Sequence, residues 1–256
     1  MKTLTNSTRL AAEQMWLPVV LVVIWFMASK NSKNMYFPSL ESIWRVFIGE
    51  LDSGRFQTNL WSSLVNLALG LACGIAVGVV VGLAVGQSRT AREILDPYLQ
   101  FARAIPQVAL VPVIIGALGI AAGPKIWAIA FATIWPVLLN TIDGVRAIDP
   151  GIRDMSHAYR IPHWLNLRKV VLPAAMPQIA AGVRVSLSIA VVIVVVSEIY
   201  GSTIGLGYFI NQSGSTFNVA ATWAGTIAIG VLGYVLNVLF MVTEKFTLKW
   251  YFESAI

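Results

Sequence analysis

Long runs of apolar residues occupy most of this chain, and short polar segments separate them. A helix needs about 20 apolar residues to cross a bilayer, because each residue adds only about 1.5 Å to its length. The pattern therefore predicts six membrane-spanning helices, of which the first is short. We expect them at residues 15–28, 60–85, 97–120, 126–142, 179–200 and 220–242.

The composition supports a membrane protein. Hydrophobic residues make up 57% of the chain and charged residues 12%, whereas an ordinary soluble domain carries about 25% charged residues. The mean hydropathy is +0.74. The only cysteine, Cys73, lies inside an apolar run, which excludes a disulfide or a cysteine-based metal site within one chain. We predict an all-α integral membrane protein with no metal site.

The positions of lysine and arginine predict the orientation in the membrane, because loops on the cytoplasmic side are enriched in them. With the N-terminus inside, eleven of these residues fall on the cytoplasmic side and five on the outer side. We therefore expect both termini in the cytoplasm. The predicted divisions are a cytoplasmic segment 1–14, a transmembrane domain 15–247 and a cytoplasmic tail 248–256. The net charge of +6 follows from this topology, so lipid is the expected partner and nucleic acid is not.

Glycines recur at every fourth position along the second predicted span. A spacing of four places them near one face of a helix, where another helix can approach to backbone contact. The ladder predicts tight packing against a helix of the same chain or, alternatively, an interface with another subunit. Its members are Gly70, Gly74, Gly78, Gly82 and Gly86.

Residues 38–51 show apolar positions at helical spacing, with charged residues elsewhere on the helical wheel. This pattern predicts a short helix on the outer surface. It either lies in the membrane interface or packs on the outer ends of the spans.

The segment 141–178 differs from everything around it. It holds five of the eighteen lysines and arginines, both histidines and four of the eleven prolines. Asp149 followed by Pro150 is typical of a helix start, and a second short helix is expected from Pro162 to an end at Leu172-Pro173. The loop 143–177 therefore predicts a cytoplasmic surface on which a soluble partner docks, or else an ordinary helical hairpin.

Within this loop the sequence resembles the EAA motif of binding-protein-dependent ABC transporter permeases. Residues 154–156 stand at the E-A-A positions, Arg160 at the glycine that follows, and residues 170–173 at the I-x-L-P ending. Residues 99–106, 182–184 and 197–207 resemble the family's L-x-x-x-R-x-I-P, G-L-R and A-E…G-L-G segments. The resemblance covers residues 55–250 and is nearest to the nitrate, alkanesulfonate and taurine branch.

This resemblance implies a type I ABC importer permease in the bacterial inner membrane. It implies a dimer of two permease copies around a pathway, two ATPase subunits docked on the EAA loops, and an extracytoplasmic solute-binding protein. It assigns ATPase coupling to Asp154, Met155, Ser156, Tyr159, Arg160, Trp164, Leu172 and Pro173. The chain lacks a G-x-x-x-x-G-K-[ST] run, so no cofactor is expected here and ATP with Mg belongs to the partner ATPase.

The loop departs from the family pattern at three positions. Met155 and Ser156 replace two alanines, and Arg160 replaces the glycine. Because its Cβ disfavours a positive φ, we expect Arg160 to avoid a left-handed turn. Its charge could instead pair with an acid on the ATPase.

Three ionisable residues, Arg103, Arg184 and Glu198, fall within predicted spans. Such residues are costly in lipid and mark either a pathway or an internal partner. The two arginines either extend to the headgroups or line a basic inner pathway that favours an anion. Glu198 either makes a structural pair or helix-end contact or lines the pathway.

We therefore expect a transport subunit rather than an enzyme. His157 and His163 are six residues apart, which does not match the i, i+4 spacing of a helical metal site. The expected substrate is a small anion such as a sulfonate, taurine or nitrate. The alternatives are a vitamin pyrimidine precursor, an aromatic carboxylate or, with no ATPase, a passive channel.

Overall fold

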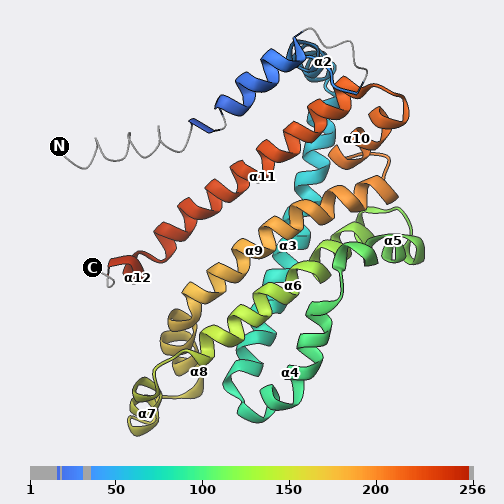
Figure 1. Cartoon of the computed structure of the whole chain (residues 1–256). Coiled ribbons are helices and arrows are strands. Elements are labelled where there is room, and N and C mark those ends of the chain that lie inside the picture. Colours follow the sequence, from blue (N-terminus) through green and yellow to red (C-terminus); the bar gives the residue numbers. More distant parts are fainter. Residues whose placement is uncertain (1–15, 18, 31–35, 254–256) are drawn as a thin grey trace, which may run out of the picture.

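A computed structural model describes residues 16, 17, 19–30 and 36–253, and within those ranges all regular structure is helical (Figure 1). The predicted N-terminal segment 1–14 lies outside the described residues. The helices after the first are α2 (Leu40–Asp52), α3 (Arg55–Gln87), α4 (Arg89–Ala104), α5 (Gln107–Leu118), α6 (Ala122–Arg146), α7 (Pro150–Ala158), α8 (His163–Asn166), the π-helical turn η1 (Leu167–Val171), α9 (Leu172–Gly201), α10 (Leu206–Ser215), α11 (Val219–Thr247) and α12 (Lys249–Glu253).

Four helical segments of the described chain are long and apolar enough to cross a membrane, and they contain α3, α6, α9 and α11. The α4–α5 pair makes a fifth if it is counted as one broken span. The first predicted span overlaps a shorter apolar helix, Val19–Ser29. The all-α membrane fold is therefore confirmed, with the first predicted span shorter than a full crossing helix.

The third predicted span, 97–120, is not one continuous helix. It is divided between α4 and α5, whose axes differ in direction by 83°. The break falls at Ile105, which has extended backbone angles, and at Pro106, which precedes the first residue of α5. Proline disfavours helical angles in the residue before it, so the Ile105-Pro106 pair ends α4.

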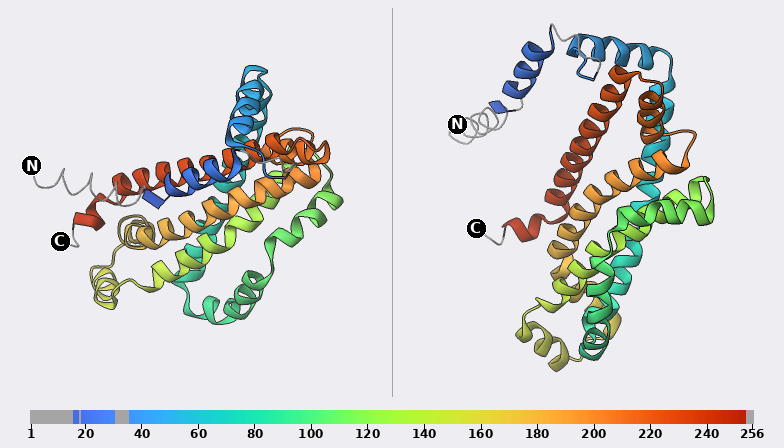
Figure 2. Two further views of the ribbon diagram at one scale, coloured as in Figure 1. Left: turned by 45° about the horizontal axis from the view of Figure 1, so that its top comes forward. Right: turned by 45° about the vertical axis from the view of Figure 1, so that its right-hand side comes forward.

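The core lies where α3, α5, α6 and α9 meet. Helix α6 supplies its centre, because Ile129 and Ala132 are almost fully buried among residues of the other three helices. Figures 1 and 2 show α6 and α9 running alongside each other, with α3 close by. In the 18-residue apolar stretch of α6, 61% of the residues are buried, whereas the corresponding fraction for α11 is 6%.

The glycine ladder of α3 packs on α6 of the same chain, which is the first of the two interpretations above. A Cβ added at Gly70 would lie 2.6 Å from the Cβ of Ile129, and one added at Gly82 would lie 2.6 Å from the Cβ of Thr141. The partner residue is always 59 positions later in the sequence, so α3 and α6 run parallel in a fixed register. The three remaining contacts of this register pair Gly74 with Thr133, Gly78 with Val137 and Gly86 with Val145.

Helices α6 and α9 make a second close contact and run in opposite directions. A Cβ at Gly144 would lie 2.9 Å from the Cβ of Gln178, and a Cβ at Gly182 would lie 2.8 Å from the Cβ of Asn140. Ser186 Oγ donates a 2.8 Å hydrogen bond to the carbonyl of Thr133 across the same interface. Helix α6 is thus held on two sides by glycine contacts.

Helix α2 crosses the end of the bundle away from α7 (Figure 2). Ser39 caps it, since its side chain accepts a hydrogen bond from Ser42 N. Ile43 is buried, and the Phe47 ring lies edge-on to Phe56 of α3 at 5.1 Å. The predicted 38–51 helix therefore packs on the spans, although Trp44 stays exposed.

The close contact between the glycine ladder and α6 predicts that a methyl group added on the ladder destabilises the protein, whereas one added at an uncrowded glycine does not. Gly82→Ala should lower the free energy of unfolding by about 1–3 kcal/mol, because the methyl has to displace Thr141. Gly230→Ala in α11 is the matched control, since nothing lies within 4 Å of its added Cβ. Thermal unfolding of the purified protein in detergent measures both, and equal midpoints for the two variants would contradict the register.

Candidate coupling loop and intramembrane polar site

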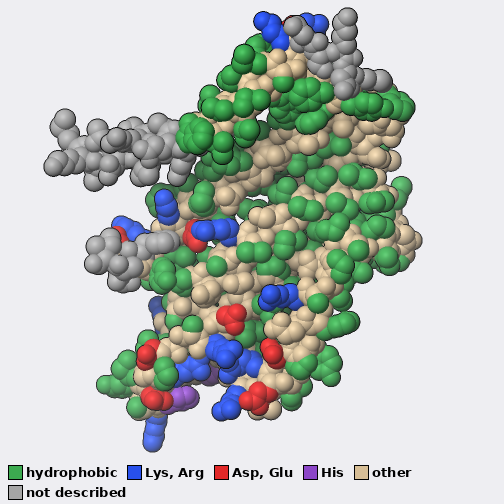
Figure 3. Space-filling model, viewed as in Figure 1, with side chains coloured by type: hydrophobic (Ala, Val, Ile, Leu, Met, Phe, Trp, Pro, Cys, Tyr) green, Lys and Arg blue, Asp and Glu red, His purple; other side chains and the backbone are tan. Residues whose placement is uncertain are grey.

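The loop between α6 and α9 forms a projection built from α7 and α8 (Figure 1). Asp149 caps α7 as expected, because its Oδ1 accepts a 2.7 Å hydrogen bond from Gly151 N. Pro150 occupies the first turn of α7. Charged and histidine side chains gather at this end of the molecule, whereas the middle of the visible face is largely apolar (Figure 3).

Large apolar side chains stand out from this projection. Tyr159 is 76% exposed, Trp164 69% and Met155 55%, although they lie in the most polar part of the sequence. Exposed aromatic clusters rimmed by charge mark binding surfaces for other proteins. These three side chains, together with the exposed Asp154, form what we call the loop-tip surface.

Three of the eight predicted coupling residues are not exposed. Ser156 is only 6% exposed, and its Oγ donates to the carbonyl of Arg153. Leu172 and Pro173 are half-buried at the start of α9. These residues shape the loop from within.

Arg160 has a φ of 50°, so the expectation that it would avoid the left-handed region is wrong. Arg160 N donates to the carbonyl of His157, and Ile161 N donates to the carbonyl of Ser156, at 3.0 Å each. This pair of bonds is a Schellman motif, in which the left-handed residue is normally glycine. The loop thus keeps the turn that a glycine would favour and places an arginine in it, at a cost of about 1–2 kcal/mol.

The second short helix also differs from the prediction, because it does not end at Leu172-Pro173. It begins after Pro162 as expected, and then continues through η1 into α9. In η1 the N–H of Leu172 bonds to the carbonyl of Leu167, one residue farther back than in an α-helix. This wider turn makes room for the ring of Pro173, which would otherwise crowd the preceding turn.

The two arginines of the predicted pathway lie in different surroundings. Arg184 of α9 forms an ion pair with Glu244 of α11. Arg103 lies in the last turn of α4, is exposed, and lines a cleft against α6. The structure does not bring the two arginines together.

Glu198 lies at the centre of a buried polar cluster and has a helix-end role. It is 0% exposed, and both its carboxyl oxygens are within 2.9 Å of Ser63 Oγ on α3. One of these oxygens also accepts a 3.0 Å hydrogen bond from Gly207 N. Leu206 N donates to Ser63 Oγ at 2.8 Å, so a single cluster satisfies the first amides of α10.

Glycine is required beside this carboxyl group. Gly205 has a φ of 132°, and a Cβ there would overlap the Glu198 carboxylate. Gly205 N also donates to Asn59 Oδ1 at 2.8 Å. Gly205 and Gly207 therefore lie so close to their neighbours that neither position has room for a Cβ.

Sequence reasoning missed several partners in these sites. Asn59 and Ser63 occupy one face of α3 at a spacing of four, and both are buried. That spacing of polar residues in an apolar helix was the available signal for a buried site. Lys125 lies between the third and fourth predicted spans, where a solvated loop residue is expected, but it is 4% exposed in α6 and donates to Ser202 Oγ at 2.8 Å. Glu244, the partner of Arg184, carried no signal that distinguished it.

The buried cluster predicts graded effects of substitution. Glu198→Ala should lower the free energy of unfolding by about 2–4 kcal/mol, because Ser63 Oγ and Gly207 N lose a buried acceptor. Glu198→Gln should lower the free energy of unfolding less, since its amide oxygen can still accept a hydrogen bond. Thermal unfolding and proteolysis of the 202–207 segment measure the difference. If both variants unfold like the parent, while transport alone changes, Glu198 lines the pathway and the helix-end role is wrong.

Comparison with known proteins places the sequence among transport permeases. The chain is 31% identical over 236 residues to the "Putative aliphatic sulfonates transport permease protein SsuC" of Bacillus subtilis, covering 91% of this chain and 86% of the relative. The Escherichia coli protein of the same description is 32% identical, covering 92% and 90%. The "Bicarbonate transport system permease protein CmpB" of Synechococcus elongatus is 32% identical, covering 83% and 74%.

The fold matches a solved importer structure. The inward-facing MetNI methionine ABC transporter aligns with a TM-score of 0.63 at 18% identity, covering 72% of this chain and 92% of that chain. This similarity concerns the fold alone. The family model for the "Binding-protein-dependent transport system inner membrane component" matches residues 74–246. These residues include the loop-tip surface and Glu198, and the chain belongs to that family of ABC importer permeases.

Proposed function

We propose that this chain is the permease subunit of an ATP-driven importer for a small oxyanion, and that the loop-tip surface couples it to a separate ATPase. The observation that carries the coupling role is the exposure of Tyr159 and Trp164. Two aromatic side chains held in water on a charged projection are stabilised when a partner covers them.

The substrate class rests on the relatives. Two of them are described as aliphatic sulfonate permeases and one as a bicarbonate permease. Sulfonates, bicarbonate and nitrate are all small oxyanions, so we assign this class to the chain. A pyrimidine precursor or an aromatic carboxylate remains the alternative, and the binding protein that delivers the solute decides between them.

The continuity of the helices supports a mechanical route from the loop to the spans. Helix α8 leads through η1 into α9 without a break. Helix α9 packs against α6 at Gly144 and Gly182, and α6 packs against α3 along the glycine ladder. A force on the loop is therefore delivered to three helices as one body, which favours rigid-body rocking between two states.

The proposed assembly contains two copies of this permease, two ATPase subunits and an extracytoplasmic solute-binding protein in the inner membrane. ATP and Mg belong to the ATPase. Reconstitution with these partners tests the function directly. At least one of an aliphatic sulfonate, bicarbonate and nitrate, presented with the binding protein, should stimulate ATP hydrolysis. If none of the three does, the substrate class is wrong.

The loop-tip surface predicts a specific failure in that system. Tyr159→Asp or Trp164→Asp should separate the ATPase from the permease, because a carboxylate would be buried in an apolar contact. Co-purification of the ATPase measures the loss. Tyr159→Phe should retain the contact, and Phe217→Asp, at an exposed aromatic in the turn between α10 and α11, serves as a matched control. Normal ATPase association in both loop variants would refute the docking role.

Arg160 predicts opposite effects on stability and coupling. Arg160→Gly should stabilise the loop by about 1 kcal/mol, because glycine adopts the left-handed turn without strain. It should also weaken ATPase stimulation by removing a charge from the contact, and Arg160→Glu should weaken it further. Arg160→Lys keeps the charge and should couple like the parent. Full stimulation in both the Gly and Glu variants would show that the charge has no part in coupling.

A further inference from the structure

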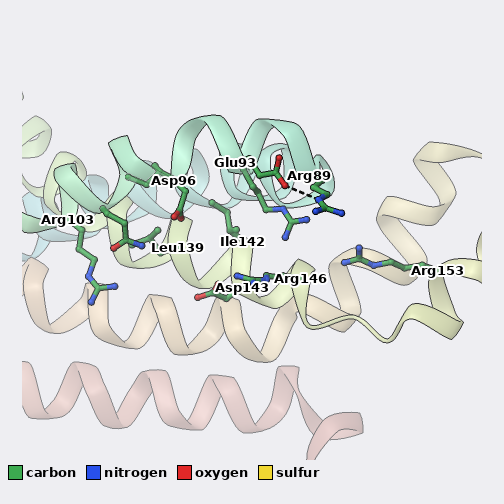
Figure 4. A pocket seen from close by; sticks show the side chains of 12 residues that line it. Arg89, Glu93, Asp96, Arg103, Leu139, Ile142, Asp143, Arg146 and Arg153 are labelled. Atoms are coloured by element: carbon green, nitrogen blue, oxygen red, sulfur yellow. Dashed lines mark hydrogen bonds and ion pairs between the residues drawn. The ribbon is translucent and has the colours of Figure 1, made fainter.

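A basic cleft of about 720 Å³ lies between α4 and the last turns of α6 (Figure 4). Five arginines and three acidic residues line it, so its net formal charge is +2. Arg103 stands at one end of the cleft, and Arg153 of the coupling loop stands at the other (Figure 4). The cleft is therefore shared by α4, α6 and α7.

Only part of this positive charge is neutralised by side chains in the described part of the chain. Arg89 Nε pairs with Glu93 at 2.8 Å, and Arg153 donates to the carbonyl of Val145. Arg92, Arg103 and Arg146 have no ion pair with any described residue. The Nε of Arg92 is buried and lacks a hydrogen-bond partner in the described part of the chain, which is a costly state for a charged group.

The walls of the cleft strengthen its interaction with an anion. Leu99, Leu139 and Ile142 line its inner side and exclude water from one face of the arginine cluster. Low-dielectric walls focus the field of like charges, so a bound anion is held more strongly than on an open surface. Guanidinium groups match the oxygens of a phosphate or sulfonate by paired hydrogen bonds.

We propose that this cleft binds an oxyanion group, supplied either by the phosphate of an anionic lipid headgroup or by a free oxyanion. Arg92 and Arg146 are its central donors, since they lie on α4 and α6 and have no ion pair with a described residue. The volume exceeds that of one phosphate and accommodates a headgroup. Basic pockets between membrane helices bind headgroups in this way. A bound oxyanion would also neutralise the charge beside Arg153 and so join α7 to α4 and α6.

The test uses the full-length protein in nanodiscs of phosphatidylcholine, with two separate additions. In the first arm, phosphatidylglycerol replaces part of the lipid. In the second, inorganic phosphate replaces chloride at equal ionic strength. The thermal unfolding midpoint is measured in each, and mass spectrometry measures the phosphatidylglycerol retained by the protein.

Paired substitutions locate any effect in the cleft. Arg92→Gln combined with Arg146→Gln should reduce oxyanion affinity by about tenfold or more, because charge-assisted hydrogen bonds are lost. Lys245→Gln combined with Lys249→Gln removes the same charge from the end of α11 and from α12, outside the cleft, and should leave binding unchanged. Asp143→Asn removes an acid from the cleft lining and should raise the affinity several-fold. This gain decides the question even if the arginine variant fails to fold.

Each outcome is decisive. A response only to phosphatidylglycerol identifies the lipid headgroup, and a response only to phosphate identifies the free oxyanion. No response of the parent in either arm overturns the proposal. The proposal is also overturned if the arginine and lysine variants lose oxyanion affinity equally, or if the affinity of Asp143→Asn is unchanged. Binding would then not depend on the charges that line the cleft.

Discussion

The close approach of α3 to α6 is the contact on which the rest of the structure depends. Inside a bilayer, apolar side chains gain little by leaving lipid, so helices associate through van der Waals contact and small residues. The ladder from Gly70 to Gly86 supplies this contact over four turns, with each glycine facing a residue 59 positions later. A register fixed at five points leaves α3 and α6 no freedom to slide. Because α6 carries α9 on its other side, the position of the polar cluster and of the coupling loop follows from this register.

The Glu198 cluster adds a second constraint, and it acts through hydrogen bonds. A non-helical backbone at membrane depth requires partners for its polar groups, since lipid offers none. The break between α9 and α10 leaves amides free at Gly205, Leu206 and Gly207, and side chains of α3 and α9 accept all three. The carboxyl of Glu198 is therefore placed where α10 begins, and α10 is fixed to α3. The burial of Glu198, which was a candidate for the pathway, is explained by the hydrogen bonds that it accepts from Ser63 and Gly207.

The sequence predicted the positions of the helices better than it predicted the contacts between them. Apolar runs located α3, α6, α9 and α11, and the spacing of glycines indicated a packed face, because both signals are local. The signal for α7 was also local, since Asp149 and Pro150 define its start. The hydrogen bond between Ser63 and Glu198 joins residues 135 positions apart. A local periodicity in the sequence does not predict a contact over such a separation. The 83° bend at Pro106 was missed because proline also occurs within continuous membrane helices.

Arg160 and Pro173 show why loop geometry was predicted poorly from single residues. Each residue was expected to oppose the backbone conformation found at its position. The surrounding hydrogen bonds decide otherwise, because the Schellman pair at Ser156 and His157 fixes the turn whatever side chain occupies it. At Pro173 a single wider turn preserves the helix. The result is a loop tied to α9 by continuous helix and to α7 by a capped turn, so the loop-tip surface is held at a fixed orientation relative to the spans. A loop with that rigidity would transmit displacement in the docking role proposed above, whereas a flexible loop would absorb it.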